Sequence, residues 1–167
     1  GATCLSVLTD MPYFQGRDEY IDSVRRISEI PVLRKDFILD PYQVVESRAL
    51  GADCILLIMA ALTDEMAAQL EAEAMALGMD VLVEVHNEHE LERALKLKTM
   101  LVGINNRNLK NLEIDLATAE NLAPMVPFPR TVVCESGIYS NDDLRRMNES
   151  RIKAFLVGES LMSQEDI

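Results

Sequence analysis

The sequence predicts an α/β fold in which parallel strands alternate with helices. Short apolar runs, rich in leucine and β-branched residues, recur along the chain, and a stretch with helical periodicity follows nearly every one of them. Strict alternation of this kind implies parallel strands joined by right-handed crossovers. The runs are almost continuously apolar, which indicates a sheet covered on both faces.

Seven segments are predicted as strands, because each is short, apolar and bounded by turn-forming or charged residues. They are residues 4–8, 32–37, 54–59, 80–85, 101–105, 131–134 and 154–157. Four of these runs lead into polar side chains that a core would not accommodate: Lys35, Glu84, Asn105 and Glu135. The carboxyl ends of parallel strands meet at one edge of the sheet, so we expect these side chains to form one site.

Helices are predicted between the strands from their periodicity and their caps. Asp18, Thr63 and Asn87 are expected to start helices, and Asp40 precedes a proline at the first helical position. Gly78 supplies a left-handed stop. The predicted helices span 18–28, 41–51, 63–78, 87–98, 115–124 and 141–147, while 11–16 is predicted as a loop and 163–167 as the first turn of a further helix.

Two architectures fit this alternation, an open doubly wound sheet and a (β/α)8 TIM barrel. The nucleotide-binding form of the open sheet needs G-x-G-x-x-G after an early strand, and the sequence has none. In a barrel the active site lies at the carboxyl ends of several strands, where the polar residues occur here. We therefore predict a single domain over residues 1–167 that is a (β/α)8 barrel with one strand missing.

The charge balance limits the classes of partner. The 28 acidic and 16 basic residues give a net charge of −12, which argues against nucleic acid and anionic membranes as partners. No apolar run approaches the ~20 residues of a membrane span, and no signal peptide is expected. Cys4, Cys54 and Cys134 lie in separate apolar runs, so we expect buried, reduced thiols in a cytoplasmic protein. A small anionic substrate remains compatible with this charge.

Lys35 and Glu84 are the first candidate catalytic residues. A lysine at a crowded strand end can act as a general acid or hold a carboxylate, although a surface lysine is the alternative. Glu84 follows three apolar residues, and a buried carboxylate there suits a general base. An internal ion pair between Glu84 and Lys35 is an equally good interpretation.

Further polar residues follow the later strands. Asn105 and Arg107 can form hydrogen bonds and bind anions, although a turn-forming Asn105-Asn106 pair is the simpler interpretation. Gly137 and Gly158 each follow one of the last two strands and precede a helix, the usual place for a phosphate in a barrel. The two histidines, His86 and His89, allow a metal site, but a solvated helix start is favoured because no further ligands converge.

Several motifs resemble the indole-3-glycerol-phosphate synthase family of tryptophan biosynthesis, in order along essentially the whole chain. They are S-V-L-T-D at 6–10, Y-F-Q-G at 13–16, V-L-R-K-D-F-I at 32–38, D-P-Y-Q at 40–43, L-L-I at 56–58, V-E-V at 83–85, G-I-N-N-R-N-L at 103–109, E-S-G-I at 135–138 and F-L-V-G-E-S-L-M at 155–162. The resemblance implies a lyase that closes the indole ring of 1-(2-carboxyphenylamino)-1-deoxyribulose 5-phosphate, with loss of CO2 and water and without a metal or redox cofactor.

The resemblance also implies a role for each matching residue. Lys35 is expected to be the general acid, Glu84 an acid/base group, and Asn105 and Glu135 groups that stabilise developing charge. The residues expected around the aromatic ring and sugar are Phe14, Phe37, Leu56 and Arg107. Those expected along the substrate and its phosphate are Ser136, Gly137, Gly158 and Glu159.

The chain departs from the family in one respect. The E-x-K-x-x-S-P motif of the family's first strand has no match, and neither do that strand's flanking helices or most of the last helix. We therefore expect a fragment holding strands two to eight, with impaired activity and a tendency to self-associate through its open edges. The alternatives are another phosphate-binding barrel, an isomerase or aldolase, which would not need Lys35, Glu84 and Asn105 together, and a non-catalytic remnant that binds a metabolite.

Overall fold

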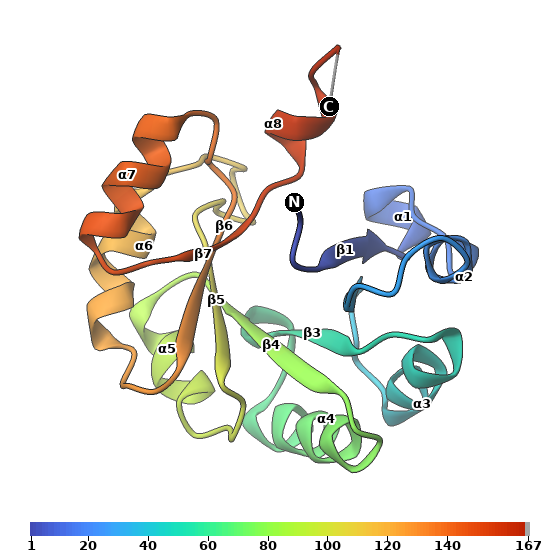
Figure 1. The fold of residues 1–167 in the computed structure, drawn as a ribbon. Helices are drawn as coiled ribbons and strands as arrows, with labels where there is room; N and C mark the ends of the chain where they lie inside the picture. The colour runs from blue at the N-terminus through green and yellow to red at the C-terminus, as the bar shows by residue number, and fades with distance from the viewer. Residues whose placement is uncertain (166–167) are drawn as a thin grey trace. The chain divides into compact units, whose positions relative to one another are not determined.

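The structure, a computed structural model, describes residues 1–165 (Figure 1). The chain forms two compact units, which are described one at a time. Unit 1 comprises Gly1–Val83 and Leu97–Thr99, and unit 2 comprises Glu84–Lys96 and Met100–Ile167. The single domain over 1–167 stays a prediction.

Unit 1 contains parallel strands flanked by helices. Strand β1 (Leu5–Leu8) pairs with β2 (Val32–Lys35), and β2 pairs with β3 (Cys54–Ile58), so Leu8 lies beside Lys35 and Leu33 beside Cys54. The helices of this unit are α1 (Met11–Phe14), α2 (Glu19–Arg25), α3 (Pro41–Leu50), the 3-10 turn η1 (Met59–Ala61) and α4 (Asp64–Ala76). Strand β4 (Asp80–Val85) begins in unit 1 and ends in unit 2.

Unit 2 repeats the same arrangement. Strand β5 (Leu101–Asn105) pairs in parallel with β6 (Thr131–Glu135), which pairs in parallel with β7 (Ala154–Leu156). The helices are α5 (Glu88–Ala94), α6 (Ala117–Leu122), the 3-10 turn η2 (Ala123–Met125), α7 (Asn141–Glu149) and α8 (Glu159–Met162). Over the described residues the strand order is that of the chain, β1 to β7. The predicted alternation of parallel strands and helices is confirmed.

Local caps explain where several helices begin and end. The Asp40 carboxylate accepts a hydrogen bond from the Tyr42 amide. The side-chain oxygen of Gln43 accepts from the Asp40 backbone N–H, which completes a capping box at the start of α3. Thr63 caps α4 through the Met66 amide. Gly51 ends α3 with a φ of 100°, a conformation that strongly favours glycine. The predicted start of α3 and its capping are confirmed.

One prediction for the amino-terminal helices is wrong, and the helix start predicted at Asp18 is confirmed in position only. Residues 11–16 are not all loop, because Asp10 accepts hydrogen bonds from the amides of Tyr13 and Phe14 and thereby starts the short helix α1. Asp18 precedes α2 but makes no side-chain capping bond, since its carboxylate pairs with Arg34 instead.

Helix lengths also differ from the prediction. Helices α2 and α5 end at Arg25 and Ala94, earlier than predicted, because periodicity does not fix where the last turn closes. At the carboxyl end, Ser163 closes α8 rather than opening a new helix, since the Gly158 carbonyl accepts from the Leu161 and Met162 amides and starts that helix earlier. The remainder of that predicted turn, residues 166–167, lies outside the described residues.

Candidate active site

The candidate catalytic lysine, Lys35, is the last residue of β2, and the loop that follows it carries one of two stacked rings. Phe14 and Phe37 are parallel, with 5.5 Å between ring centroids and 2° between their planes. Lys35 Nζ lies 5.5 Å from the centroid of Phe14, within the range of a cation–π contact. Tyr13 packs its ring edge against Phe37 at 5.5 Å. Unit 1 therefore places a cation next to an aromatic surface. The roles predicted for Lys35, Phe14 and Phe37 stay predictions.

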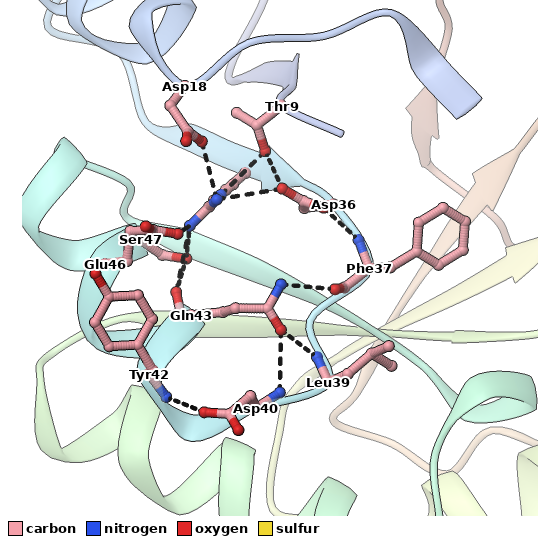
Figure 2. Close-up of polar contacts among 11 residues, drawn as sticks. Thr9, Asp18, Asp36, Phe37, Leu39, Asp40, Tyr42, Gln43, Glu46 and Ser47 are labelled. Atoms are coloured by element: carbon pink, nitrogen blue, oxygen red, sulfur yellow. Dashed lines mark hydrogen bonds and ion pairs between the residues drawn. The ribbon is translucent and has the colours of Figure 1, made fainter. Parts of the chain in front are cut away.

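A buried arginine in β2 anchors this loop. Arg34 is 3% exposed, and its guanidinium lies 3.2 Å from Oδ2 of Asp36 and donates to Thr9 Oγ1 at 3.0 Å. Thr9 in turn donates its hydroxyl to Oδ2 of Asp36 at 2.5 Å. Oδ1 of Asp18 lies 2.9 Å from Nη2 of Arg34, the nitrogen that also contacts Asp36 (Figure 2), and Oε2 of Glu46 lies 2.9 Å from Nη1. The negative charge of three carboxylates surrounds one buried cation.

The other end of the loop is held by α3. Gln43 donates its amide nitrogen to the Phe37 carbonyl at 2.9 Å, while its amide oxygen accepts from the backbone of Leu39 and Asp40 (Figure 2). Asp36 accepts from the Phe37 amide at 2.8 Å. The backbone that follows Lys35 is therefore fixed from two sides.

Leu56 lies apart from this loop. It is 1% exposed in the middle of β3, between the equally buried Ile55 and Leu57. Its predicted contact with an aromatic substrate ring stays a prediction.

In unit 2, a row of side chains links the ends of β4, β5 and β6. Asn105 donates its amide nitrogen to Oε1 of Glu84 at 3.2 Å, and Ser136 donates its hydroxyl to Oδ1 of Asn105 at 2.9 Å. The Arg107 amide also donates to Oδ1 of Asn105. These two donors fix the orientation of the Asn105 amide, so its N–H groups face Glu84. Glu84 is 1% exposed, and a carboxylate buried to this extent needs such partners.

The next residue, Asn106, organises the backbone around this row. It is 2% exposed, and its amide nitrogen donates to the carbonyls of Glu135 and Ser136, each at 3.1 Å. Its amide oxygen accepts from the Ala119 amide at 3.0 Å in α6. The sequence suggested a turn-forming asparagine pair, but Asn106 is a buried link between β5, β6 and α6.

The segment after β6 has an unusual backbone. Ser136 has a φ of 63° and Gly137 a φ of 85°, both in the left-handed region. A Cβ at Gly137 would lie 2.8 Å from Cγ2 of Ile114, so glycine is required there by contact as well as by φ. Glu135, 3% exposed, precedes this turn. The contact with a phosphate predicted for Ser136 and Gly137 stays a prediction.

Arg107 and Glu159 form an ion pair between the loop after β5 and the start of α8. Nη2 of Arg107 lies 2.6 Å from Oε2 of Glu159. A Cβ at Gly158 would meet no described atom within 4 Å, so packing does not require glycine there. The predicted contact of Gly158 with a phosphate stays a prediction.

The surroundings of His86 differ from the prediction. His89 and Glu88 are exposed, as a solvated helix start requires, but Glu90 is 9% exposed and the His86 side chain only 11%. His86 lies between Glu84 and Glu90, because residues two apart on a strand point to the same face and Glu90 folds back from α5. Within the described residues no group of three or more His, Cys, Asp or Glu could hold a metal ion.

Comparison with known proteins decides the family. The sequence model of indole-3-glycerol phosphate synthase matches residues 1–167. The chain belongs to the indole-3-glycerol phosphate synthase family. The indole-3-glycerol phosphate synthase of Azospirillum brasilense is 64% identical over 167 residues, which are 100% of this chain and 64% of that protein. The protein of the same name from Rhodospirillum rubrum is 58% identical over 168 residues, again 100% of this chain and 64% of the relative.

The chain thus spans 64% of the length of these relatives. The predicted indole-3-glycerol phosphate synthase resemblance is confirmed as family membership. No described helix is long and apolar enough to cross a membrane.

Solved structures agree on the fold. The N-acetylmannosamine-6-phosphate 2-epimerase from Clostridium perfringens matches with a TM-score of 0.73 at 14% identity, over 96% of this chain and 73% of that one. FabK from Thermotoga maritima matches with a TM-score of 0.73 at 10% identity, over 95% of this chain and 51% of that one. At these identities the likeness shows the fold alone, and the predicted class, an incomplete (β/α)8 barrel, is confirmed.

Sequence reasoning missed two buried or half-buried residues of this candidate site. Asn106 was recognised only as part of a turn, and His86 only as a weak metal candidate. One signal was available for His86: it lies two residues after Glu84 at the end of a predicted strand, and residues two apart on a strand point to the same face.

Proposed function

We propose that this chain carries the acid/base and substrate-binding residues of an indole-3-glycerol phosphate synthase. In this reaction 1-(2-carboxyphenylamino)-1-deoxyribulose 5-phosphate closes to indole-3-glycerol phosphate, with release of CO2 and water. The observation that supports it best is the hydrogen-bonded row Ser136–Asn105–Glu84 at the strand ends of a chain from this family. An isomerase or aldolase would not need this row together with Lys35.

Proton transfer is assigned to two groups. Lys35 is the general acid on the carbonyl of the substrate, where a protonated amine helps the ring to close. Glu84 acts in the acid/base steps of dehydration, and its buried carboxylate is held at a fixed angle by Asn105. Glu135 and Asn105 stabilise charge that develops on the substrate.

The aromatic part of the substrate is assigned to the rings of unit 1. Phe14 and Phe37 offer flat apolar faces beside Lys35, and Leu56 adds an aliphatic contact. Arg107 is assigned to the sugar or carboxylate of the substrate, since a guanidinium forms two parallel hydrogen bonds with a planar anion.

The phosphate is assigned to backbone groups after β6 and β7. Ser136, Gly137 and Gly158 supply N–H donors and, at Ser136, a hydroxyl. The carboxylate of Glu159 pairs with Arg107 and would repel a phosphate, so its contribution is the backbone N–H. Because the occupant carries phosphate and carboxylate, the proposed partner is a small anionic metabolite. We also propose a cytoplasmic location, which the three free cysteines support. Cys134 is buried as predicted, but the prediction is wrong for Cys4, which is exposed because it lies ahead of β1.

The test is a rate assay with the named substrate, read out by the absorbance and fluorescence of the indole product. Glu84→Gln and Lys35→Met are expected to lower kcat by roughly 10²- to 10⁴-fold, the usual range for a lost general acid or base. Glu88→Gln, an exposed glutamate on α5, is the matched control and keeps the parent rate.

Binding of a non-cyclisable substrate analogue, measured by calorimetry alongside the rate assay, distinguishes an enzyme from a protein that only binds the metabolite. An enzyme binds the analogue and turns over the substrate. Analogue binding without turnover would favour a metabolite-binding protein, and full activity in Glu84→Gln would contradict the assigned role.

A further inference from the structure

The buried histidine after β4 has two carboxylate partners. Nε2 of His86 lies 3.1 Å from Oε1 of Glu84, and Nδ1 lies 2.9 Å from Oε2 of Glu90. The Nε2 contact lacks the alignment of a hydrogen bond, so it acts through charge when the ring is protonated. Among the described residues of unit 2, these two carboxylates are the charged groups with the largest effect on the ring.

The side chain of Glu90 is fixed by hydrogen bonds from Asn87 and from the backbone of His86. Its Oε1 accepts from the side-chain amide of Asn87 at 2.7 Å, and its Oε2 also accepts from the His86 backbone N–H at 2.9 Å. Asn87 caps α5 by accepting from the Glu90 amide at 3.0 Å. The start of α5 therefore fixes the carboxylate that orients the imidazole.

We propose that His86 and Glu90 are positioning residues for Glu84: the imidazolium of His86 holds the Glu84 carboxylate ionised and in place, and Glu90 holds the imidazolium. This inference deepens the proposed function and rests on Glu84 acting there as an acid/base group. The contacts run from Glu90 to His86 to Glu84, and the Asn105 amide donates to the same Glu84 oxygen, Oε1, that His86 Nε2 contacts.

The charge state of the ring agrees with this geometry. Burial lowers the pKa of His86, but the contacts with Glu84 and Glu90 outweigh it and raise the pKa to about 9. Burial likewise raises the pKa of Glu90, and the contacts with His86 and Asn87 bring it below its usual value. At neutral pH the ring is protonated and carries a positive charge beside Glu84.

A purely structural role for His86 makes a different prediction. If His86 only completed the cap of α5, its removal would lower stability and leave the pH dependence of the reaction unchanged. If it holds Glu84 ionised, its removal favours the protonated form of Glu84, because a neighbouring opposite charge is lost. The pH–rate profile therefore distinguishes the two roles.

The variants are His86→Gln and Glu90→Gln. The matched control is His89→Gln, since His89 is exposed and lies on α5, the helix that carries Glu90. In the whole protein, His86→Gln is expected to move the acidic limb of kcat/KM toward higher pH by about 1–3 units, the effect of losing an adjacent charge. His89→Gln leaves the profile unchanged. A fall in kcat with an unmoved profile in His86→Gln would overturn the proposal.

A second measurement does not depend on activity. In the His89→Gln background a single histidine remains, and its ring ¹⁵N shifts are followed by NMR from pH 5 to 10. The expected midpoint is near pH 9, and Glu90→Gln lowers it. A midpoint at or below 6.5 would overturn the proposal. If the protein shows no ring closure at all, the proposed function fails, and this titration still decides whether the imidazolium pair exists.

Discussion

The side-chain amide of Asn105 donates to Oε1 of Glu84 across 3.2 Å. The orientation of the Asn105 amide is fixed, because the Ser136 hydroxyl and the Arg107 backbone N–H both donate to its oxygen, Oδ1. Asn105→Asp keeps the shape but puts a carboxylate against that of Glu84. We expect kcat to fall by about 10²-fold, the size of effect seen when one aligned donor is removed. Asn108→Asp, at an exposed position of the next loop, is the control in steady-state kinetics. Equal rates in both variants would contradict the assigned contact.

Asn106 is expected to matter for stability. Asn106→Ala leaves the Ala119 amide and the Ser136 carbonyl without the partner seen here, while the Glu135 carbonyl keeps its bond from the backbone N–H of residue 106. Each buried polar group without a partner costs about 1–3 kcal/mol, so we expect a loss of roughly 3 kcal/mol in the free energy of unfolding, measured in urea. Asn121→Ala, on the exposed side of α6, is expected to stay within about 0.5 kcal/mol. An unchanged free energy of unfolding in Asn106→Ala would contradict this role and show that water replaces the lost hydrogen bonds.

Asn106 also marks the limit of sequence reasoning for this fold. The strands and the cap at Asp40 were predictable, because apolar runs and capping residues act over a few positions. The contacts of Asn106 span 28 to 30 residues to β6, and no local pattern contains them. The polar run around His86 and Glu90 predicted a solvent-exposed helix start, because its sequence does not contain the contacts that bury these two side chains. Burial is set by the neighbouring strands, which sequence periodicity does not specify.

Arg34 illustrates the same point and gives a third prediction. It joins Thr9, Asp18 and Glu46, which are distant in sequence. Arg34→Met leaves three carboxylates around an apolar group, and breaking a buried ion pair on one side costs about 3–5 kcal/mol. Arg26→Met, which removes an exposed pair with Asp22, is expected to change stability by less than about 1 kcal/mol. Similar unfolding midpoints for the two variants would contradict the role of Arg34.

The His86–Glu90 pair predicts how stability depends on pH. The pKa of His86 is raised from 6.5 to about 9, so its contribution is complete below about pH 6.5 and is lost as the pH rises through 9. The pKa of Glu90 is lowered from 4.5, so its contribution is present above about 4.5 and is lost as the pH falls. For this pair, stability is therefore greatest between about pH 4.5 and 6.5.

Urea unfolding from pH 4 to 9.5 measures that dependence. Glu90→Gln is expected to flatten the decline above pH 6.5, because the His86 pKa then lies closer to its unfolded value. Glu88→Gln, exposed on the same helix, is expected to leave the curve unchanged. A curve for Glu90→Gln that runs parallel to the parent at alkaline pH would rule out the pair as its source.

The turn at Gly137 provides the last prediction through a matched pair of glycines. Gly137 and Gly78 have φ values of 85° and 72°, so alanine at either position adopts a left-handed backbone at a cost of about 1–2 kcal/mol. At Gly78 a new Cβ would meet no described atom within 4 Å, whereas at Gly137 it would lie 2.8 Å from Ile114. Gly137→Ala is therefore expected to lose about 1–3 kcal/mol more than Gly78→Ala, as overpacking typically does. Relief of that contact moves the backbone assigned to phosphate, so the KM for the substrate is expected to rise in Gly137→Ala alone. Equal losses of stability in the two variants, with unchanged KM, would show that the turn yields without disturbing the site.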